Sequence, residues 1–412
     1  MRILRNDAAA KWVAGVAARA GQFARKEPKV RRIINEVRRR GDSAVREYAR
    51  QWDQLGRKPL RVSSVEMRHA LRSASRELMA KVELAAANIR KFAERQKPVE
   101  WVHERGGILT GQLVRPLDSV GCYVPGGRYP LVSTLLMTVI PAQVAEVQRI
   151  CVVSPNPKPE LLAIAHWLGV KEFYRVGGAQ AIAALGYGTQ SIPRVNKIVG
   201  PGNAYVTVAK KLVAFDCAID MLAGPTEAVI VSHEGNPKGI AADMVAQAEH
   251  DPDAISILIT CSERLAAQTS KETINLAQEN SVARQALKNN GCILIARSRV
   301  QAMEWANELA PEHITVEAQD IERIRSAGSV FVGGYSAQAA GDYASGPNHV
   351  LPTSGAARFR GGLTVHDFVK LITVQRLSRR GLQGIAPTIM SLAETEGLKA
   401  HAESVRVRLQ NA

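Results

Sequence analysis

Apolar residues in the first part of the chain recur at the spacing of amphipathic helices. Over residues 30–40 they fall at i, i+3, i+4 and i+7, which is one face of a helix. Gly41 then predicts the end of this helix, and Asp42 predicts the cap of a second helix over residues 43–52. Residues 64–96 continue the helical spacing. The N-terminal part is therefore expected to be helical.

The pattern changes near residue 117, where short runs rich in Val and Ile begin to alternate with helical segments. Continuous apolar strands separated by helices are typical of parallel sheets that are covered on both faces. The apolar runs are numerous enough for two such sheets, with a boundary between the sheets near residues 223–225. From about residue 362 the chain returns to helix. The apolar runs occupy residues 120–124, 150–153, 173–176, 198–199, 228–231, 255–259, 293–296 and 329–332.

Length and composition set the broad class. A chain of 412 residues is too long for one hydrophobic core, so two or more lobes are expected. With 46% hydrophobic and 22% charged residues, the composition is that of an ordinary globular protein. No apolar run approaches the roughly 20 residues that span a bilayer, and the N-terminus lacks a secretory signal pattern. We expect a soluble cytoplasmic protein without membrane contact.

The formal net charge of +16 is concentrated near the ends of the chain, and residues 1–50 hold fourteen Lys and Arg against five Asp and Glu. A basic face can bind nucleic acid through its phosphates. However, the arginines of residues 31–40 alternate with apolar residues at helical spacing, and no aromatic interleaving accompanies them. We interpret the charge as a solvated helical surface and keep nucleic-acid binding as the less favoured alternative.

Cysteine usage argues against two kinds of site. The five cysteines are odd in number, widely spread and without a CxxC pair, which argues against a disulfide framework and a thiolate zinc site. Cys122 lies in a Gly-rich turn, but no histidine is near it in sequence, so we expect an unreactive buried thiol.

Glycine-rich turns follow three of the predicted strands. They lie at residues 123–127, 176–180 and 199–203, and none has the GxGxxG spacing of the standard dinucleotide fingerprint. Glycine permits close backbone approach, and a following helix N-terminus can bind phosphate. Tyr123, Gln180 and Asn203 add a ring and two amides at these turns. Taken alone, the turns favour a nucleotide only slightly, because α/β proteins need glycine at many such positions.

Polar residues of the C-terminal half suggest a metal site and an acid–base pair. Gln247 and His250 share one helix face at i and i+3, and Asp342 and His401 can add a carboxylate and a second imidazole. Such a set without cysteine suits zinc with open positions for a substrate. Glu312 and His313 are two adjacent titratable groups, and the pKa of an imidazole suits proton transfer near neutrality. Spacing alone does not show that these groups converge.

Seven motifs, in this order along the chain, resemble the histidinol dehydrogenase family. The resemblance runs from about residue 30 to the C-terminus and implies two Rossmann-like parallel-sheet domains with small helical N- and C-terminal segments. The motifs are 120–127 (VGCYVPGG), 178–185 (GAQAIAAL), 200–205 (GPGNAY), 223–227 (AGPTE), 247–252 (QAEHDP), 310–313 (APEH) and 341–353 (GDYASGPNHVLPT).

The resemblance also implies a division of the chain. Residues 1–25 would form a helical segment, and residues 26–122 with 224–363 the first Rossmann-like domain. Residues 123–223 would form the second, NAD-binding domain, and residues 364–412 a helical dimerisation segment.

The resemblance further implies roles for individual residues. By position, Zn²⁺ would be held by Gln247, His250, Asp342 and His401, the last from the partner subunit of a homodimer. NAD would contact Tyr123, Gln180 and Asn203. The substrate would contact Thr226, His349 and Glu396 in addition to the zinc ligands and His313.

The implied reaction is the oxidation of histidinol to histidine in histidine biosynthesis by two hydride transfers to NAD. His313 would accept the alcohol proton, and Glu312 would activate water on the aldehyde. Two departures matter: Thr226 stands where serine is frequent, and the surface is unusually basic. A related branch oxidises sulfonated diols, which leaves a second substrate class open, and a basic interaction protein on this scaffold is the third reading.

Overall fold

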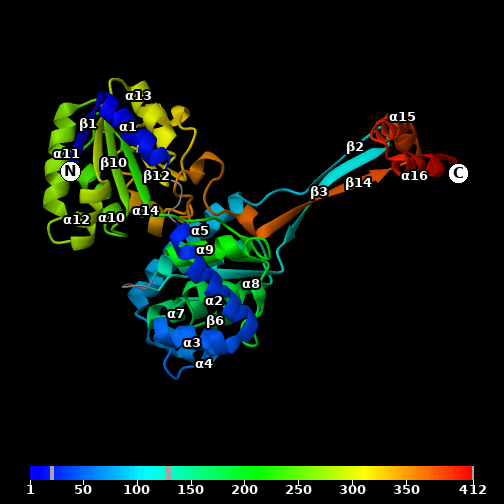
Figure 1. Cartoon of the computed structure of the whole chain (residues 1–412), viewed down its shortest axis with the longest axis horizontal. Helices are drawn as coiled ribbons and strands as arrows, with labels where there is room; N and C mark the ends of the chain where they lie inside the picture. The colour runs from blue at the N-terminus through cyan, green and yellow to red at the C-terminus, as the bar shows by residue number, and fades with distance from the viewer. Residues whose placement is uncertain (19–22, 127–130, 411–412) are drawn as a thin grey trace.

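The computed structural model describes residues 1–18, 23–126 and 131–410 and contains three sheets. Two sheets are parallel, with five and six strands, and the third is antiparallel with three strands. Helices pack against both parallel sheets (Figure 1). The expected α/β architecture with two Rossmann-like parallel sheets is confirmed.

The middle of the chain builds the five-stranded sheet in the order β6-β5-β4-β7-β8. The chain therefore starts in the centre of the sheet and switches sides between β4 and β7. The strands are β4 (Ser119–Tyr123), β5 (Arg149–Val153), β6 (Glu172–Tyr174), β7 (Lys197–Val199) and β8 (Ala218–Ile219). The helices between them are α6 (Val132–Val144), α7 (Pro159–Trp167), α8 (Gly178–Tyr187) and α9 (Ala204–Val213).

Strand β5 shows why the sequence of this sheet is continuously apolar. Val152 packs into a hydrophobic core on one face, while Cys151 and Val153 pack into a separate core on the other. Since both faces are covered, successive side chains are all buried, and the alternation typical of a half-exposed strand is absent.

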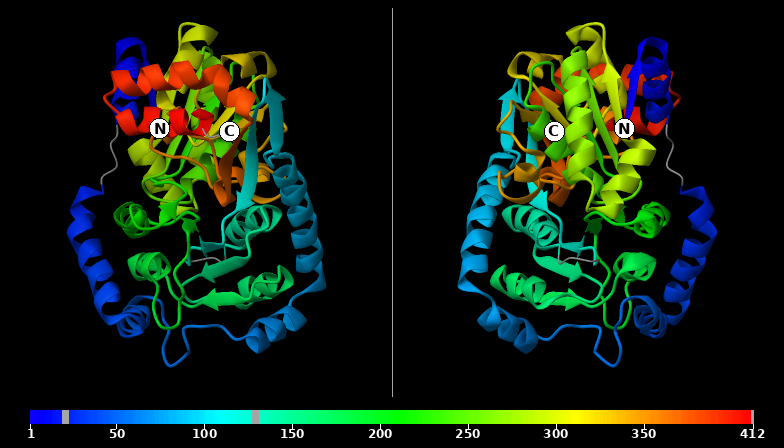
Figure 2. Two further views of the ribbon diagram at one scale, coloured as in Figure 1. Left: turned by 90° about the vertical axis from the view of Figure 1, so that its right-hand side faces the viewer. Right: turned by 90° about the vertical axis from the view of Figure 1, so that its left-hand side faces the viewer.

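The N-terminal helices complete both faces of the five-stranded sheet. After the turn η1 (Ala24–Lys26), they are α2 (Glu27–Arg40), α3 (Asp42–Trp52), α4 (Ser64–Ser73) and α5 (Arg76–Arg95). Helices α2 and α3 pack on the α8 side, whereas α4 and α5 pack on α7 and α6. Figure 2 shows these blue helices flanking the green sheet from both sides. The predicted helical region 64–96 is thus two helices, divided where Ser75 caps α5.

The expectation that Asp42 caps the following helix was wrong. Helix α3 begins at Asp42 itself and has no side-chain cap. The Asp42 carboxylate instead accepts hydrogen bonds from the Thr189 hydroxyl (2.6 Å), the Ser191 amide (3.0 Å) and the Ser191 hydroxyl. A long-range contact therefore prevailed over the local one, and it fastens the α2–α3 turn to the loop after α8.

The six-stranded sheet has the order β1-β11-β10-β9-β12-β13, and all its strands are parallel. Its chain switches sides between β9 and β12. The strands are β1 (Arg2–Arg5), β9 (Glu227–Val231), β10 (Ile255–Thr260), β11 (Cys292–Ile295), β12 (His313–Val316) and β13 (Ser329–Val332). The helices are α1 (Asn6–Ala17), α10 (Pro237–Ala248), α11 (Glu263–Leu276), α12 (Ser281–Asn290), α13 (Arg299–Leu309), η2 (Ala318–Arg323) and α14 (Gln338–Tyr343).

The antiparallel sheet forms an arm that extends away from both parallel sheets (Figure 1). Its strands are β2 (Trp101–Arg105), β3 (Ile108–Pro116) and β14 (Val369–Leu377), and its tip carries α15 (Arg379–Thr395) and α16 (Lys399–Gln410). The short turns η3 (Ala356–Arg358) and η4 (Val365–Phe368) precede the arm. Large apolar side chains on it are exposed, including Val99, Val102, Leu371 and Leu392.

The expected division of the chain needs correction. Residues 1–25 include strand β1, which pairs with β11, and residues 364–412 include strand β14. Residues 27–95 pack on the five-stranded sheet and not on the sheet of residues 224–363. Strand β4 crosses the boundary expected at residue 122. These differences arise because pairing between distant segments leaves no local mark in the sequence.

Among the residues that the structure describes, no helix is both long and apolar enough to cross a membrane.

Candidate active site

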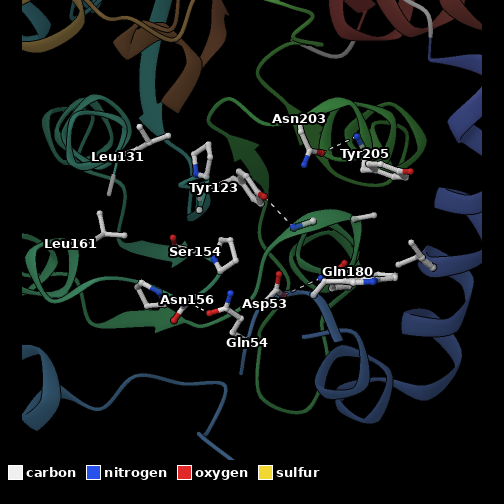
Figure 3. Close-up of a pocket in the computed structure, with 18 of the residues that line it drawn as sticks. Asp53, Gln54, Tyr123, Leu131, Ser154, Asn156, Leu161, Gln180, Asn203 and Tyr205 are labelled. Carbon is white, nitrogen blue, oxygen red and sulfur yellow. Dashed lines mark hydrogen bonds between the residues drawn. The ribbon is translucent and has the colours of Figure 1, made fainter. Parts of the chain in front are cut away.

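A cavity of about 530 Å³ opens at the carboxyl edge of the five-stranded sheet. Tyr123 ends β4, Gln180 lies in the first turn of α8, and Asn203 directly precedes α9. These three side chains, far apart in sequence, line this one cavity (Figure 3). The cavity lies beside the point where the chain switches sides between β4 and β7, which is the usual ligand site of an open parallel sheet.

Each of these three side chains has a defined polar environment. The Tyr123 hydroxyl accepts a hydrogen bond from the Gly178 amide (3.1 Å), and the Gln180 Nε2 group donates to Asp53 (3.0 Å). The Asn203 Oδ1 atom caps α9 by accepting from two backbone amides. Helix N-termini and amide side chains at one edge of a sheet suit a ligand with phosphates and polar rings.

A buried ion pair holds the turn before α9 in place. Lys210 Nζ lies 2.6 Å from Asp220 Oδ1, both side chains are almost fully buried, and Lys210 also donates to the Gly200 carbonyl. Asp220 Oδ2 in turn accepts from the Gly200 amide (2.7 Å). Gly200 adopts φ +111°, and a Cβ atom there would collide with the Tyr123 carbonyl oxygen. Glycine is therefore required for the two turns to meet.

A second polar cluster lies at the amino edge of the six-stranded sheet. Glu312 immediately precedes β12, His313 begins it, and Thr226 immediately precedes β9. Glu312 Oε2 accepts from the Thr226 hydroxyl (2.5 Å) and from the Glu227 amide (3.0 Å). His313 Nδ1 lies 3.7 Å from Glu312 Oε2. This structure therefore brings the predicted acid–base pair and Thr226 together.

Helices α10 and α14 add the predicted metal ligands Gln247 and Asp342 to this cluster. Asp342 Oδ1 lies 3.5 Å from His313 Nε2. Gln247 Nε2 donates to the Thr226 hydroxyl, whose own proton goes to Glu312. Since these hydrogen bonds fix which end of the amide faces Thr226, the Gln247 Oε1 atom is the end that faces away from it.

Burial and neighbouring charges shift the titration of this cluster. Burial raises the pKa of Glu312 above its ordinary value. Burial alone would lower the pKa of His313, but the Glu312 and Asp342 carboxylates outweigh it, and this pKa is raised. Burial alone would raise the pKa of Asp342, yet the His313 ring outweighs it and holds this pKa below its ordinary value. A buried carboxylate and imidazole with shifted pKa values are typical of proton-transfer sites.

The two further predicted histidines lie beside Asp342. His250 follows α10, is exposed, and is close enough to act electrostatically on the carboxylate. His349 Nδ1 lies 2.7 Å from the Asp342 carbonyl oxygen, and its Nε2 lies 3.3 Å from the Thr134 hydroxyl of α6. The loop that carries His349 therefore links the polar cluster to the five-stranded sheet.

The remaining two predicted site residues are not part of either cluster. Glu396 ends α15 and His401 lies in α16, so both are exposed at the tip of the arm (Figure 1). Over residues 1–18, 23–126 and 131–410, no three His, Cys, Asp or Glu side chains are grouped to hold a metal ion. A site built from Gln247, His250 and Asp342 thus lacks its fourth predicted ligand within one chain.

Cys122 takes no part in either cluster. Its thiol is buried, and burial raises the pKa of Cys122 to about 12. A thiol with so high a pKa is a poor nucleophile near neutrality. The expectation of an unreactive thiol is consistent with this environment.

Comparison with known proteins places these motifs in one family. A model of the family described as histidinol dehydrogenase matches residues 17–409. The chain belongs to the histidinol dehydrogenase family.

Similar proteins of this family come from distant organisms. The histidinol dehydrogenase of Methanosarcina mazei is 44% identical over 91% of this chain and 90% of its own length. That of Methanothermobacter thermautotrophicus is 45% identical over 92% of each. A solved histidinol dehydrogenase structure from Elizabethkingia anophelis is 36% identical, covers 100% of this chain and 98% of its own, and has a TM-score of 0.93.

The structure adds two polar residues that sequence reasoning on the histidinol dehydrogenase motifs missed. Asp53 follows α3 and lines the cavity beside Gln180. Asp243 lies one turn before Gln247 on α10 and accepts a hydrogen bond from the Gln338 amide at the start of α14. The Gln338 side chain donates to the Thr315 hydroxyl of β12 (3.1 Å). Neither aspartate stands in a recognisable motif, so only the tertiary contacts reveal them.

The burial of Asp243 leads us to expect that the protein becomes less stable as pH rises from acid to neutral. Burial raises the pKa of Asp243 to about 6, whereas the unfolded carboxyl titrates near its ordinary value. The folded state then binds more protons than the unfolded state between these values, so the free energy of unfolding falls as pH rises through this window. Because the group is partly exposed, we expect a loss of about 1–2 kcal/mol, which Asp243→Asn removes.

Urea unfolding of the metal-free protein on either side of this window measures the effect. The wild type should lose stability relative to Asp243→Asn on going from acid to neutral pH. The exposed Asp216, changed to Asn, is the matched control and should follow the wild type. Parallel curves for the wild type and Asp243→Asn would contradict the prediction.

Proposed function

We propose that this chain oxidises L-histidinol to L-histidine through L-histidinaldehyde, using zinc and NAD. The observation that carries the proposal is the buried Glu312–His313 pair, which is bonded through Thr226 to Gln247 and lies beside Asp342. The similar proteins from Methanosarcina mazei and Elizabethkingia anophelis bear the name histidinol dehydrogenase. The same chemistry on this chain would make it an enzyme of histidine biosynthesis.

The donor chemistry of the cluster fits zinc. An amide oxygen from Gln247, the His250 imidazole and the Asp342 carboxylate are borderline-to-hard donors that leave room for a substrate. His401 of the partner subunit would complete the set. Tyr123, Gln180 and Asn203 would hold NAD in the cavity of the five-stranded sheet. When bound, zinc would polarise and hold the substrate nitrogens, and NAD would accept a hydride in each half-reaction.

His313 is suited to the first half-reaction. Its Nε2 atom faces Asp342, so a substrate held beside that carboxylate would place its alcohol next to the imidazole. The neutral ring accepts the hydroxyl proton while the carbon loses a hydride, and the alcohol becomes an aldehyde. Glu312 beside Nδ1 stabilises the charged ring that results.

Glu312 is suited to the second half-reaction. Burial raises its pKa, which makes the carboxylate a better proton acceptor than an exposed one. It takes a proton from water as the oxygen adds to the aldehyde carbon, and the hydrate then loses the second hydride to give the carboxylate. The Thr226 hydroxyl and the Glu227 amide hold Glu312 in place for this step.

The substrate's own groups match the remaining predicted contacts. His349 is half-buried beside the Asp342 carbonyl, and loss of contact with water lowers the pKa of its ring, which favours the neutral form that can accept or donate a hydrogen bond. Glu396 would supply a carboxylate for the substrate's amino group from the partner subunit's arm. Thr226 lines the same space from the sheet side.

We further propose that the chain acts as a homodimer with shared active sites. The arm exposes apolar side chains on its strands and its terminal helices, among them Val102, Leu371 and Leu392. Apolar patches of this kind are typical of protein interfaces. Since Glu396 and His401 stand at the tip of this arm, a second copy is the simplest means of bringing them to the cluster.

The test is NADH formation with zinc-loaded protein. Histidinol should give two molecules of NADH per molecule oxidised, because the reaction removes four electrons, and metal analysis should find about one zinc per chain. Removing zinc with a chelator should abolish turnover. Turnover of sulfopropanediol without turnover of histidinol would contradict the proposed substrate and favour the other branch.

The division of labour between the two catalytic residues is separately testable. His313→Asn should slow NADH formation from histidinol by about a hundredfold or more, since it removes the base of the first step. Glu312→Gln should act mainly on NADH formation from histidinaldehyde. Glu83→Gln, at an exposed position on α5, is the control and should leave both steps unchanged. Equal losses in both steps for both variants would contradict the assignment.

Shared sites predict complementation between two inactive chains. In a mixed dimer of His401→Ala and Glu312→Gln chains, one of the two sites receives Glu312 and His401 both intact. An equal mixture that exchanges subunits should therefore recover about a quarter of wild-type activity. No recovery, with mixed dimers verified by mass spectrometry, would show that each chain uses its own His401.

A further inference from the structure

The cavity of the five-stranded sheet contains one buried polar atom without a partner. Gln180 is 1% exposed, and among the described residues its Oε1 atom has no hydrogen-bond partner. The same side chain lines the cavity. A buried acceptor without a donor is costly unless a ligand satisfies it.

Asp53 determines which end of the Gln180 amide is left unpaired. Asp53 Oδ2 accepts a hydrogen bond from the Gly177 amide (2.9 Å) and another from Gln180 Nε2 (3.0 Å). Because this oxygen already accepts from a backbone N–H, the Gln180 group that faces it must be the NH₂ donor. The opposite amide orientation would set two acceptors against each other.

Gly178 lies next to the unpaired oxygen, and its amide contacts the Tyr123 hydroxyl. Gly178 adopts φ +61°, and a Cβ atom there would lie 2.8 Å from Gln180 Oε1, so glycine keeps the space beside this oxygen clear. The Tyr123 hydroxyl accepts from the Gly178 amide, which leaves its own proton to donate (Figure 3). An acceptor and a donor thus lie on either side of Gly178.

We propose that Asp53 is a positioning residue that fixes Gln180 as an acceptor for an NH₂ group of the cofactor. The inference rests on the proposed use of NAD, which carries such a group on the nicotinamide carboxamide and on adenine. Both groups present a donor next to an acceptor, which complements Gln180 Oε1 and the Tyr123 hydroxyl. Asp53 itself acts through Gln180.

The Asp53→Leu substitution should release the amide. Leucine is similar in size to aspartate but has no acceptor, so Gln180 Nε2 loses the oxygen that holds it. The Gln180 amide can then turn its NH₂ group toward the ligand, which would set two donors against each other. We expect NAD to bind about tenfold more weakly or worse, measured by calorimetry on the zinc-loaded protein without substrate.

The Asp53→Asn substitution is the conservative control and should keep binding. The Gly177 amide and Gln180 Nε2 both donate to Asp53 Oδ2, so the side-chain oxygen of an asparagine in that place can accept both hydrogen bonds. NAD affinity should stay within about threefold of wild type. Gln180→Glu alone should weaken binding, because it sets two carboxylates against each other. A role of Asp53 through its negative charge alone predicts instead that Asp53→Asn weakens binding as much as Asp53→Leu.

Cofactor analogues test the same point without any substitution. The 3-acetylpyridine analogue of NAD lacks the carboxamide NH₂, and the hypoxanthine analogue lacks the adenine NH₂. One of them should bind the wild type about tenfold more weakly than NAD and lose that penalty in Asp53→Leu, which identifies the group that Gln180 contacts. Asp216→Asn, an exposed carboxylate-to-amide change on the same domain, should bind all three like wild type.

The outcomes separate this inference from the proposed function. NAD binding by wild type together with unchanged binding by Asp53→Leu, or equal losses in Asp53→Asn and Asp53→Leu, would overturn the role of Asp53. Equal affinity of the wild type for NAD and both analogues would overturn it as well, even if Asp53→Leu does not fold. Failure of the wild type to bind NAD would overturn the proposed function itself.

Discussion

The polar cluster of the six-stranded sheet is organised by one buried carboxylate. Glu312 is removed from water between the amino ends of β9 and β12, so its charge must be satisfied by fixed donors. Thr226 and the Glu227 amide supply them, and the Thr226 hydroxyl is thereby oriented to accept from Gln247. Because the Glu312 carboxylate only accepts, it determines which group donates in each of these hydrogen bonds. Asp53 acts on Gln180 in the same way at the other site, where the amide oxygen is left buried and without a hydrogen-bond partner among the described residues.

The two parallel sheets contribute opposite edges. The five-stranded sheet offers the cavity at its carboxyl edge, whereas the six-stranded sheet offers the Glu312 cluster at its amino edge. At the carboxyl edge of the six-stranded sheet, Glu317 accepts from the His233 amide (2.8 Å) and pairs with Arg299 (2.6 Å). A carboxylate of the chain itself thus takes the donors beside the switch point of that sheet. The carboxyl edge of the six-stranded sheet is therefore partly filled by the chain's own side chains, unlike that of the five-stranded sheet.

Local signals in the sequence predicted much of the fold. The apolar runs of β5 and β10 and the helical spacing of α2 were sufficient, because burial on defined faces leaves a periodic mark. The packing of residues 27–95 on the five-stranded sheet was not predictable, nor was the pairing of β1. Those contacts join segments far apart in the chain. For the site, the motifs singled out Glu312 and His313, but Asp53 and Asp243 were visible only once the chain was folded.

The proposed active site forms where the two sheets meet and is completed by a second copy of the chain. Anomalous X-ray diffraction at the zinc edge, from crystals grown with zinc, NAD and histidinol, tests this arrangement most directly. We expect a zinc peak bound by Gln247, His250 and Asp342 of one chain and by His401 of the partner subunit, with NAD in the cavity beside Tyr123. Zinc bound by His401 of the same chain, or NAD at the carboxyl edge of the six-stranded sheet, would contradict it.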